Sequence, residues 1–108
     1  MTMYITRQDL HVFYQQAHQN VAKQIGIENH EWKSASELAE EIQTANSVVA
    51  SKLKSFIATY ESWFKVHEEI DSAGTAGNLS SEQNKKLLNA IAARDSTRKE
   101  LIAELARL

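Results

Sequence analysis

The 108-residue sequence contains no proline, no cysteine and only three glycines. Proline and glycine supply most turns and interrupt most helices, so their scarcity predicts long helices with few connections. The absence of cysteine excludes disulfide bonds, thiol nucleophiles and zinc sites with thiolate ligands. A chain without disulfide bonds fits a reducing compartment, so we expect a cytoplasmic location.

The sequence also lacks a long apolar run and a large net charge. No stretch reaches the roughly 18 apolar residues that would predict a membrane-spanning helix. A formal net charge of −2 argues against a dedicated nucleic-acid-binding protein, because such proteins usually carry a basic surplus. The length and the hydrophobic content of 43% predict a single helical domain over residues 1–108.

The first predicted helix spans about residues 7–25. Thr6 precedes it as a candidate N-cap, because a threonine hydroxyl can accept a hydrogen bond from a free amide of the first turn. Gly26 follows it, in the position where a helix commonly ends in a left-handed residue. Between these two signals, apolar residues recur at helical spacing: Leu10, Phe13, Tyr14, Ala17, Val21 and Ile25.

A column of apolar residues spaced by seven predicts one long central helix over about residues 34–72. Its members are Ala35, Ile42, Val49, Phe56, Trp63 and Ile70. No glycine or proline interrupts residues 27–73, and Ser34 is a candidate N-cap. At about 1.5 Å per residue this helix would form a rod of roughly 55–60 Å.

The third predicted helix spans about residues 81–107 and pairs with the central helix as an antiparallel hairpin. The segment Gly74–Asn78 supplies the turn, and Ser80 with Gln83 has capping-box spacing. The register places Glu69 near Lys86 and the polar stretch 94–100 opposite residues 53–59. That stretch is either solvated, a basic contact, or a break where Thr97 caps a fourth helix. The predicted fold class is therefore all-α, with three helices.

The aromatic half of the central helix is the predicted interaction surface. If the 7–25 helix packs antiparallel along an unbroken central helix, it covers that helix only as far as about residue 52. One flank of residues 56–70 would then have no cover from the same chain. Tryptophan and tyrosine are enriched at interfaces, which predicts a homodimer seam or a partner site here; the alternative is ordinary core. The residues concerned are Phe56, Tyr60, Trp63 and Phe64.

No motif for catalysis, cofactor binding or metal binding is present in the sequence. We therefore expect a non-enzymatic protein–protein interaction module, such as a small adaptor, chaperone, inhibitor or immunity-type binder, that binds another protein or itself. The alternatives are a structural assembly subunit and a nucleic-acid-binding protein. The second alternative would use a local basic patch consisting of Lys52, Lys54, Arg94, Arg98 and Lys99.

Overall fold

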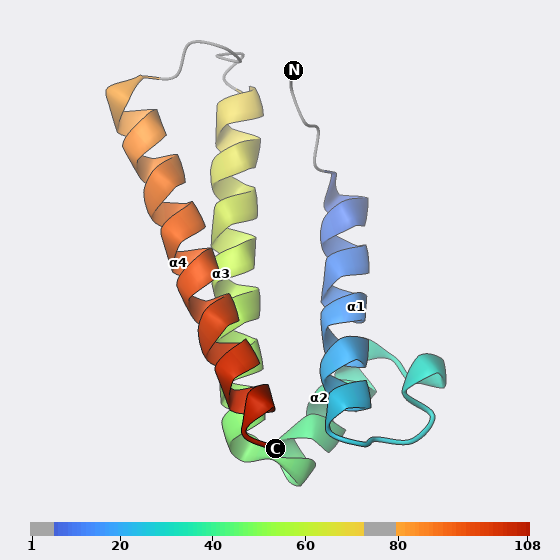
Figure 1. Cartoon of the computed structure of the whole chain (residues 1–108). Helices are drawn as coiled ribbons and strands as arrows, with labels where there is room; N and C mark the ends of the chain where they lie inside the picture. Colours follow the sequence, from blue (N-terminus) through green and yellow to red (C-terminus); the bar gives the residue numbers. More distant parts are fainter. Residues whose placement is uncertain (1–5, 73–79) are drawn as a thin grey trace.

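The computed structural model describes residues 6–72 and 80–108, and of residues 71 and 72 it describes the backbone alone. Within these segments every regular element is helical: α1 (Arg7–Gln24), a 3₁₀ turn (His30–Trp32), α2 (Ala35–Ala45), α3 (Ser47–Ser72) and α4 (Ser81–Ala106) (Figure 1). The all-α prediction is confirmed. The predicted turn at Gly74–Asn78 lies outside the described residues.

The predicted helix starts are confirmed by their hydrogen bonds. The hydroxyl of Thr6 accepts from the amide of Asp9 at 3.2 Å, and the carboxylate of Asp9 accepts from the amide of Thr6 at 2.9 Å. Ser34 caps α2, and Ser80 caps α4. Each cap satisfies amides that have no partner within their own helix, so each start is determined locally.

The C-terminus of α1 has the hydrogen bonds of a Schellman motif. The amide of Ile27 donates to the carbonyl of Ala22 at 2.9 Å, and the amide of Gly26 donates to the carbonyl of Lys23 at 3.2 Å. Gly26 adopts a φ of +84°, a conformation that costs glycine little and other residues more. These hydrogen bonds and the left-handed conformation of Gly26 end α1 and set the direction of the backbone that follows it.

Helices α3 and α4 form the predicted antiparallel hairpin (Figure 1). Lys86 pairs with Glu69 at 3.0 Å, as the register predicts. Further along, the hydroxyls of Thr59 and Thr97 are 2.7 Å apart. The 94–100 stretch thus lies about one turn closer to the C-terminus of α3 than predicted. The stretch is part of the continuous helix α4, so no separate helix begins at Thr97.

The prediction of an unbroken helix over residues 34–72 is wrong, because the chain bends at Asn46. This residue is extended, with φ −158° and ψ 97°. Its amide donates to Ile42 at 2.8 Å and closes α2, while its side-chain oxygen accepts from the amide of Val49 at 3.1 Å and opens α3. Asparagine is among the strongest N-cap residues, which explains why the chain starts a new helix here.

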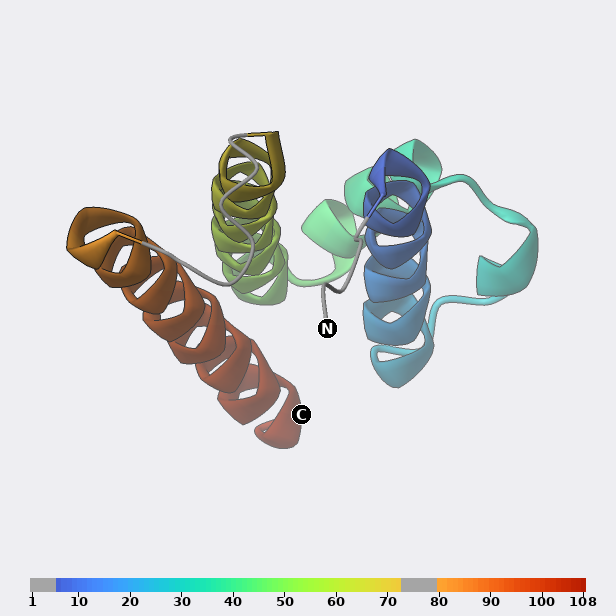
Figure 2. The same ribbon diagram turned by 90° about the horizontal axis from the view of Figure 1, so that it is seen from above.

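The bend places α1 alongside the aromatic half of α3. Arg7 at the start of α1 lies 3.5 Å from Glu68 near the end of α3, so the two helices run antiparallel over most of α1. Viewed from above, α1 and α4 lie on different sides of α3, with α2 beside α1 (Figure 2). The molecule measures 47 × 26 × 19 Å, too short for a rod of roughly 55–60 Å.

The hydrophobic core joins all four α-helices. Its central side chains are Val21, Ala22, Leu38, Ile42, Val49, Ala50, Leu53, Ile57 and Leu101.

None of the helices in the described segments is both long and apolar enough to cross a membrane.

Candidate interaction surfaces

The predicted aromatic interface lies against α1 and α4 of the same chain. Trp63 and Phe64 are 7% and 2% exposed, while Phe56 and Tyr60 are half-buried. The expectation that this flank of α3 has no intramolecular cover is therefore wrong, and the reason is the bend at Asn46. Neither Trp63 nor Phe64 can reach a partner without opening the helices around it.

Rings from α1 and α3 form a continuous aromatic cluster. Phe13 stacks on Tyr60 with 3.6 Å between centroids and meets Phe56 edge-on at 5.5 Å. Burial raises the pKa of the Tyr60 hydroxyl; nearby Arg94 opposes this and Asp9 adds to it. The cluster holds α1 on α3 through contacts that the heptad pattern alone does not specify.

Arg94 of α4 lies over the indole ring of Trp63. The guanidinium carbon lies 4.5 Å from the centre of the indole ring, within the range of a cation–π contact. Arg94 also lies 3.4 Å from the carboxylate of Asp95. The indole Nε1 is buried, and no hydrogen-bond partner for it lies among the residues described. Trp63 therefore functions as a packing residue between α3 and α4.

Three of the five basic residues predicted as one patch, Lys54, Arg94 and Arg98, can be placed from their neighbours. Lys54 lines a hollow together with Glu40, Gln43 and other residues of α2. Arg98 lines a groove between α1 and α4. Arg94 lies on Trp63 as described above. Lys54, Arg94 and Arg98 thus have different surroundings in the fold.

An apolar groove separates α1 from the C-terminal half of α4. Its volume is about 220 Å³, and its walls include Phe13 and Ala17 of α1 and Ile102 and Leu105 of α4. Ile102 is 53% exposed although it is aliphatic. The groove is a little larger than the cavity of about 150 Å³ that holds a benzene molecule, so it can accept an aliphatic side chain.

The most exposed large apolar residue of the described chain is Trp32, in the 3₁₀ turn between α1 and α2. It is 85% exposed, whereas tryptophan is usually well buried. Its exposure was not predicted from the sequence. The available signal is the local sequence, since charged or polar residues fill positions 28–31 and the apolar residue at i+3 is the small Ala35.

The segment that carries Trp32 is held by side-chain hydrogen bonds from α1. The side-chain amide nitrogen of Gln15 donates to the carbonyl of Lys33 at 3.0 Å, and its oxygen accepts from the amide of Ala35 at 3.1 Å. Lys33 also pairs with Glu41 of α2 at 2.8 Å. Trp32 is thus presented to solvent on an ordered backbone, which lowers the entropy that binding would cost.

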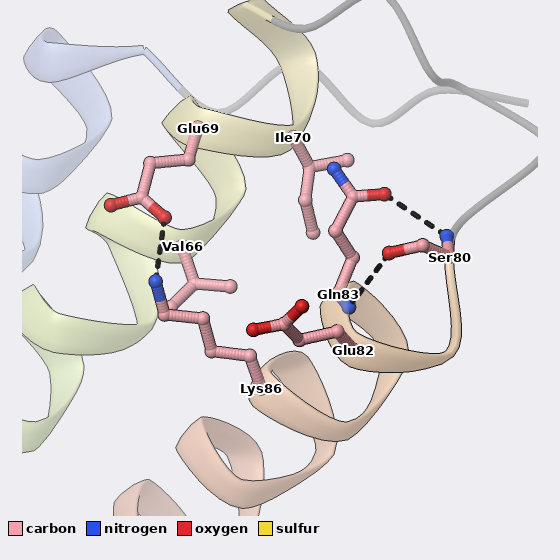
Figure 3. Close-up of a pocket in the computed structure, with 7 residues that line it drawn as sticks. All are labelled: Val66, Glu69, Ile70, Ser80, Glu82, Gln83 and Lys86. Carbon is pink, nitrogen blue, oxygen red and sulfur yellow. Dashed lines mark hydrogen bonds and ion pairs between the residues drawn. The ribbon is translucent and has the colours of Figure 1, made fainter.

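Another pocket lies where α3 ends and α4 begins (Figure 3). It has a volume of about 390 Å³, with Val66 on its apolar side and the Glu69–Lys86 ion pair at one edge. Ser80, at the opposite edge, accepts a hydrogen bond from the amide of Gln83, so its hydroxyl caps α4.

The histidines are separated from one another. His18 is 3% exposed, and its Nδ1 lies 2.8 Å from the carbonyl of Tyr14. His30 lies 3.2 Å from the carbonyl of Ile27 and 3.8 Å from Glu31. Across residues 6–72 and 80–108, no three acidic or histidine side chains are grouped closely enough to hold a metal ion.

Comparisons of the chain with models of known protein families, with curated proteins and with solved structures found no match. The function must therefore be argued from the surfaces described above.

Proposed function

We propose that this protein is a non-catalytic protein–protein interaction module of the adaptor, chaperone, inhibitor or immunity type. The observation that carries the proposal is the 85% exposure of Trp32 on a backbone held by Gln15. Tryptophan is enriched among residues that dominate binding energy, and a rigid turn presents it without an ordering cost. A cytoplasmic location remains part of this proposal, supported by the absence of cysteine.

The partner that suits this surface is a protein with an apolar pocket that accepts an indole ring. Glu28 and Glu31 beside the turn are exposed, so the pocket is expected to be rimmed by basic or neutral residues rather than by acids. The nucleic-acid alternative is not part of the proposal, because Lys54 and Arg98 lie at different surfaces.

Affinity capture from the source organism with three versions of the protein tests the proposal. The wild type and a Val48→Ala control should retain the same stoichiometric partner, and Trp32→Ala should lose it. Val48 is a matched control because it is 50% exposed and lies on α3, away from the turn. Recovery of no stoichiometric partner, or equal recovery by all three versions, would contradict the proposal.

A further inference from the structure

Helix α4 carries a partly exposed apolar stripe beside the face that packs on α3, and the C-terminal half of this stripe borders the groove to α1. Leu88 and Ile102 are 57% and 53% exposed, and Ile91 and Leu105 are half-buried. With Asp95 and Arg98 between them, these residues follow the alternating spacing of three and four that a coiled-coil seam requires. The stripe is about 26 Å long at 1.5 Å per residue.

The stripe is complementary to itself when a second copy runs antiparallel. In that register Leu88 faces Leu105 of the second copy, Ile91 faces Ile102, and Asp95 faces Arg98. A twofold axis between residues 96 and 97 then generates every contact twice, as a closed dimer requires. A parallel pairing would instead place Asp95 on Asp95 and Arg98 on Arg98, which is unfavourable.

Two further features fit the antiparallel register. Lys85 and Lys99 flank the stripe on the same side as Ala92 and Ala106. In the antiparallel dimer, residues on this side face the same side of the second copy, so Lys85 would face Ala106 and Lys99 would face Ala92. These lysines therefore meet no like charge. The groove beside Ile102 and Leu105 lies where Leu88 of the second copy arrives, and its volume of about 220 Å³ suits an aliphatic side chain.

We infer that α4 forms an antiparallel homodimer seam in which Asp95 and Arg98 of one chain pair with Arg98 and Asp95 of a second copy. The charged centre fixes the register, and the aliphatic ends supply the buried apolar area. This seam replaces the aromatic half of α3 as the self-association surface. A single helix pair buries less than a standard interface, so the dimer is weak.

Within one chain, Asp95 lies 3.4 Å from Arg94. Asp95 is 45% exposed at its side chain, and Arg98 is exposed. Exposure leaves both side chains free to reorient toward a second copy. Their replacement should leave the fold intact, which circular dichroism and thermal denaturation will verify.

Sedimentation velocity from about 10 to 500 µM tests the inference with exchanged charges. The wild type should show a concentration-dependent dimer. Asp95→Arg and Arg98→Asp should each weaken dimerisation at least about tenfold, because both reversed contacts become repulsive. An equimolar mixture of the two variants should restore the dimer, and so should the double variant D95R/R98D.

Restoration by mixing is specific to this seam, because contacts within one chain cannot be repaired by another chain. Ile102→Ser should weaken the dimer, and Val48→Ser, at a similarly exposed apolar position outside the seam, should not. Trp32→Ala should also leave dimerisation unchanged, so the result is independent of the proposed partner surface. A wild-type monomer at 500 µM would overturn the inference. So would a dimer insensitive to both charge variants, or a mixture that stays monomeric.

Discussion

Replacement of Asn46 by alanine should destabilise the protein, because this residue closes α2 and opens α3 at once. Alanine cannot accept the 3.1 Å hydrogen bond that Asn46 accepts from the amide of Val49. Loss of an asparagine N-cap costs about 1 kcal/mol, within a range of about 0.5–2 kcal/mol. Alanine also has the higher helix propensity, by about 0.5 kcal/mol, which favours the competing unbroken helix.

We therefore expect Asn46→Ala to lower the free energy of unfolding by about 1–1.5 kcal/mol. For a domain of this size, each kcal/mol corresponds to a decrease in Tm of about 4–8 °C. Urea denaturation followed by circular dichroism measures the effect, and an unchanged m-value will show that unfolding exposes as much surface in the variant as in the wild type.

Two control variants separate the cap from other effects of the substitution. Asn46→Asp keeps an acceptor oxygen at a helix N-terminus and should stay within about 0.3 kcal/mol of the wild type. Asn20→Ala, at an exposed position inside α1, should be neutral or slightly stabilising, because alanine is the better helix former. An Asn46→Ala variant as stable as the wild type would refute the assignment of the bend to this cap.

Three further predictions concern side chains that join the helices. Gln15→Ala should cost about 1–2 kcal/mol, since two hydrogen bonds are lost, whereas Gln16→Ala should cost little; equal thermal stability of both variants would contradict this. Arg94→Met should cost about 0.5–1 kcal/mol through the lost cation–π contact with Trp63, as measured by urea denaturation, and a stabilised variant would count against it. Because burial raises the pKa of Tyr60, its neutral form stabilises the fold below pH about 10, and this contribution is lost as pH rises through the folded-state pKa. Absorbance titration at 295 nm should show that Tyr60→Phe removes the tyrosine that ionises at the higher pH, and loss of an early-ionising one would be inconsistent with the cluster.

Local signals in the sequence were sufficient to predict the starts of α1, α2 and α4 and the hairpin. Thr6, Ser34 and Ser80 act through hydrogen bonds to residues three positions later, so their effect does not depend on the rest of the fold. The pairing of Glu69 with Lys86 also followed, because a short connection limits the register of two antiparallel helices.

The bend at Asn46 was missed because the heptad column continues through it. Val49 and Ile42 are both fully buried, so the apolar spacing looks the same on either side of the break. The local signal was the polar pair Asn46–Ser47, which suits an N-cap better than a helix interior. Once the bend was missed, the position of α1 and the burial of Trp63 could not be predicted, since both depend on long-range packing.

The proposed sites differ in how far the sequence could reveal them. The spacing of Leu88, Ile91, Ile102 and Leu105 is visible in the sequence, but their exposure depends on which side of α4 faces α3. The exposure of Trp32 likewise depends on the path between α1 and α2, which the hydrogen bonds of Gln15 determine. A residue's contact with its own chain or with solvent is a property of packing rather than of local pattern.

The central claim is that the bend at Asn46 folds α1 back along the aromatic half of α3. Nuclear Overhauser contacts between the ring protons of Phe13 and Tyr60 test it most directly, because the ring centroids lie 3.6 Å apart. The account predicts strong contacts between these two rings at concentrations where the protein is monomeric. Contacts from Phe13 to residues before position 52 of the chain, without any to Tyr60, would contradict it.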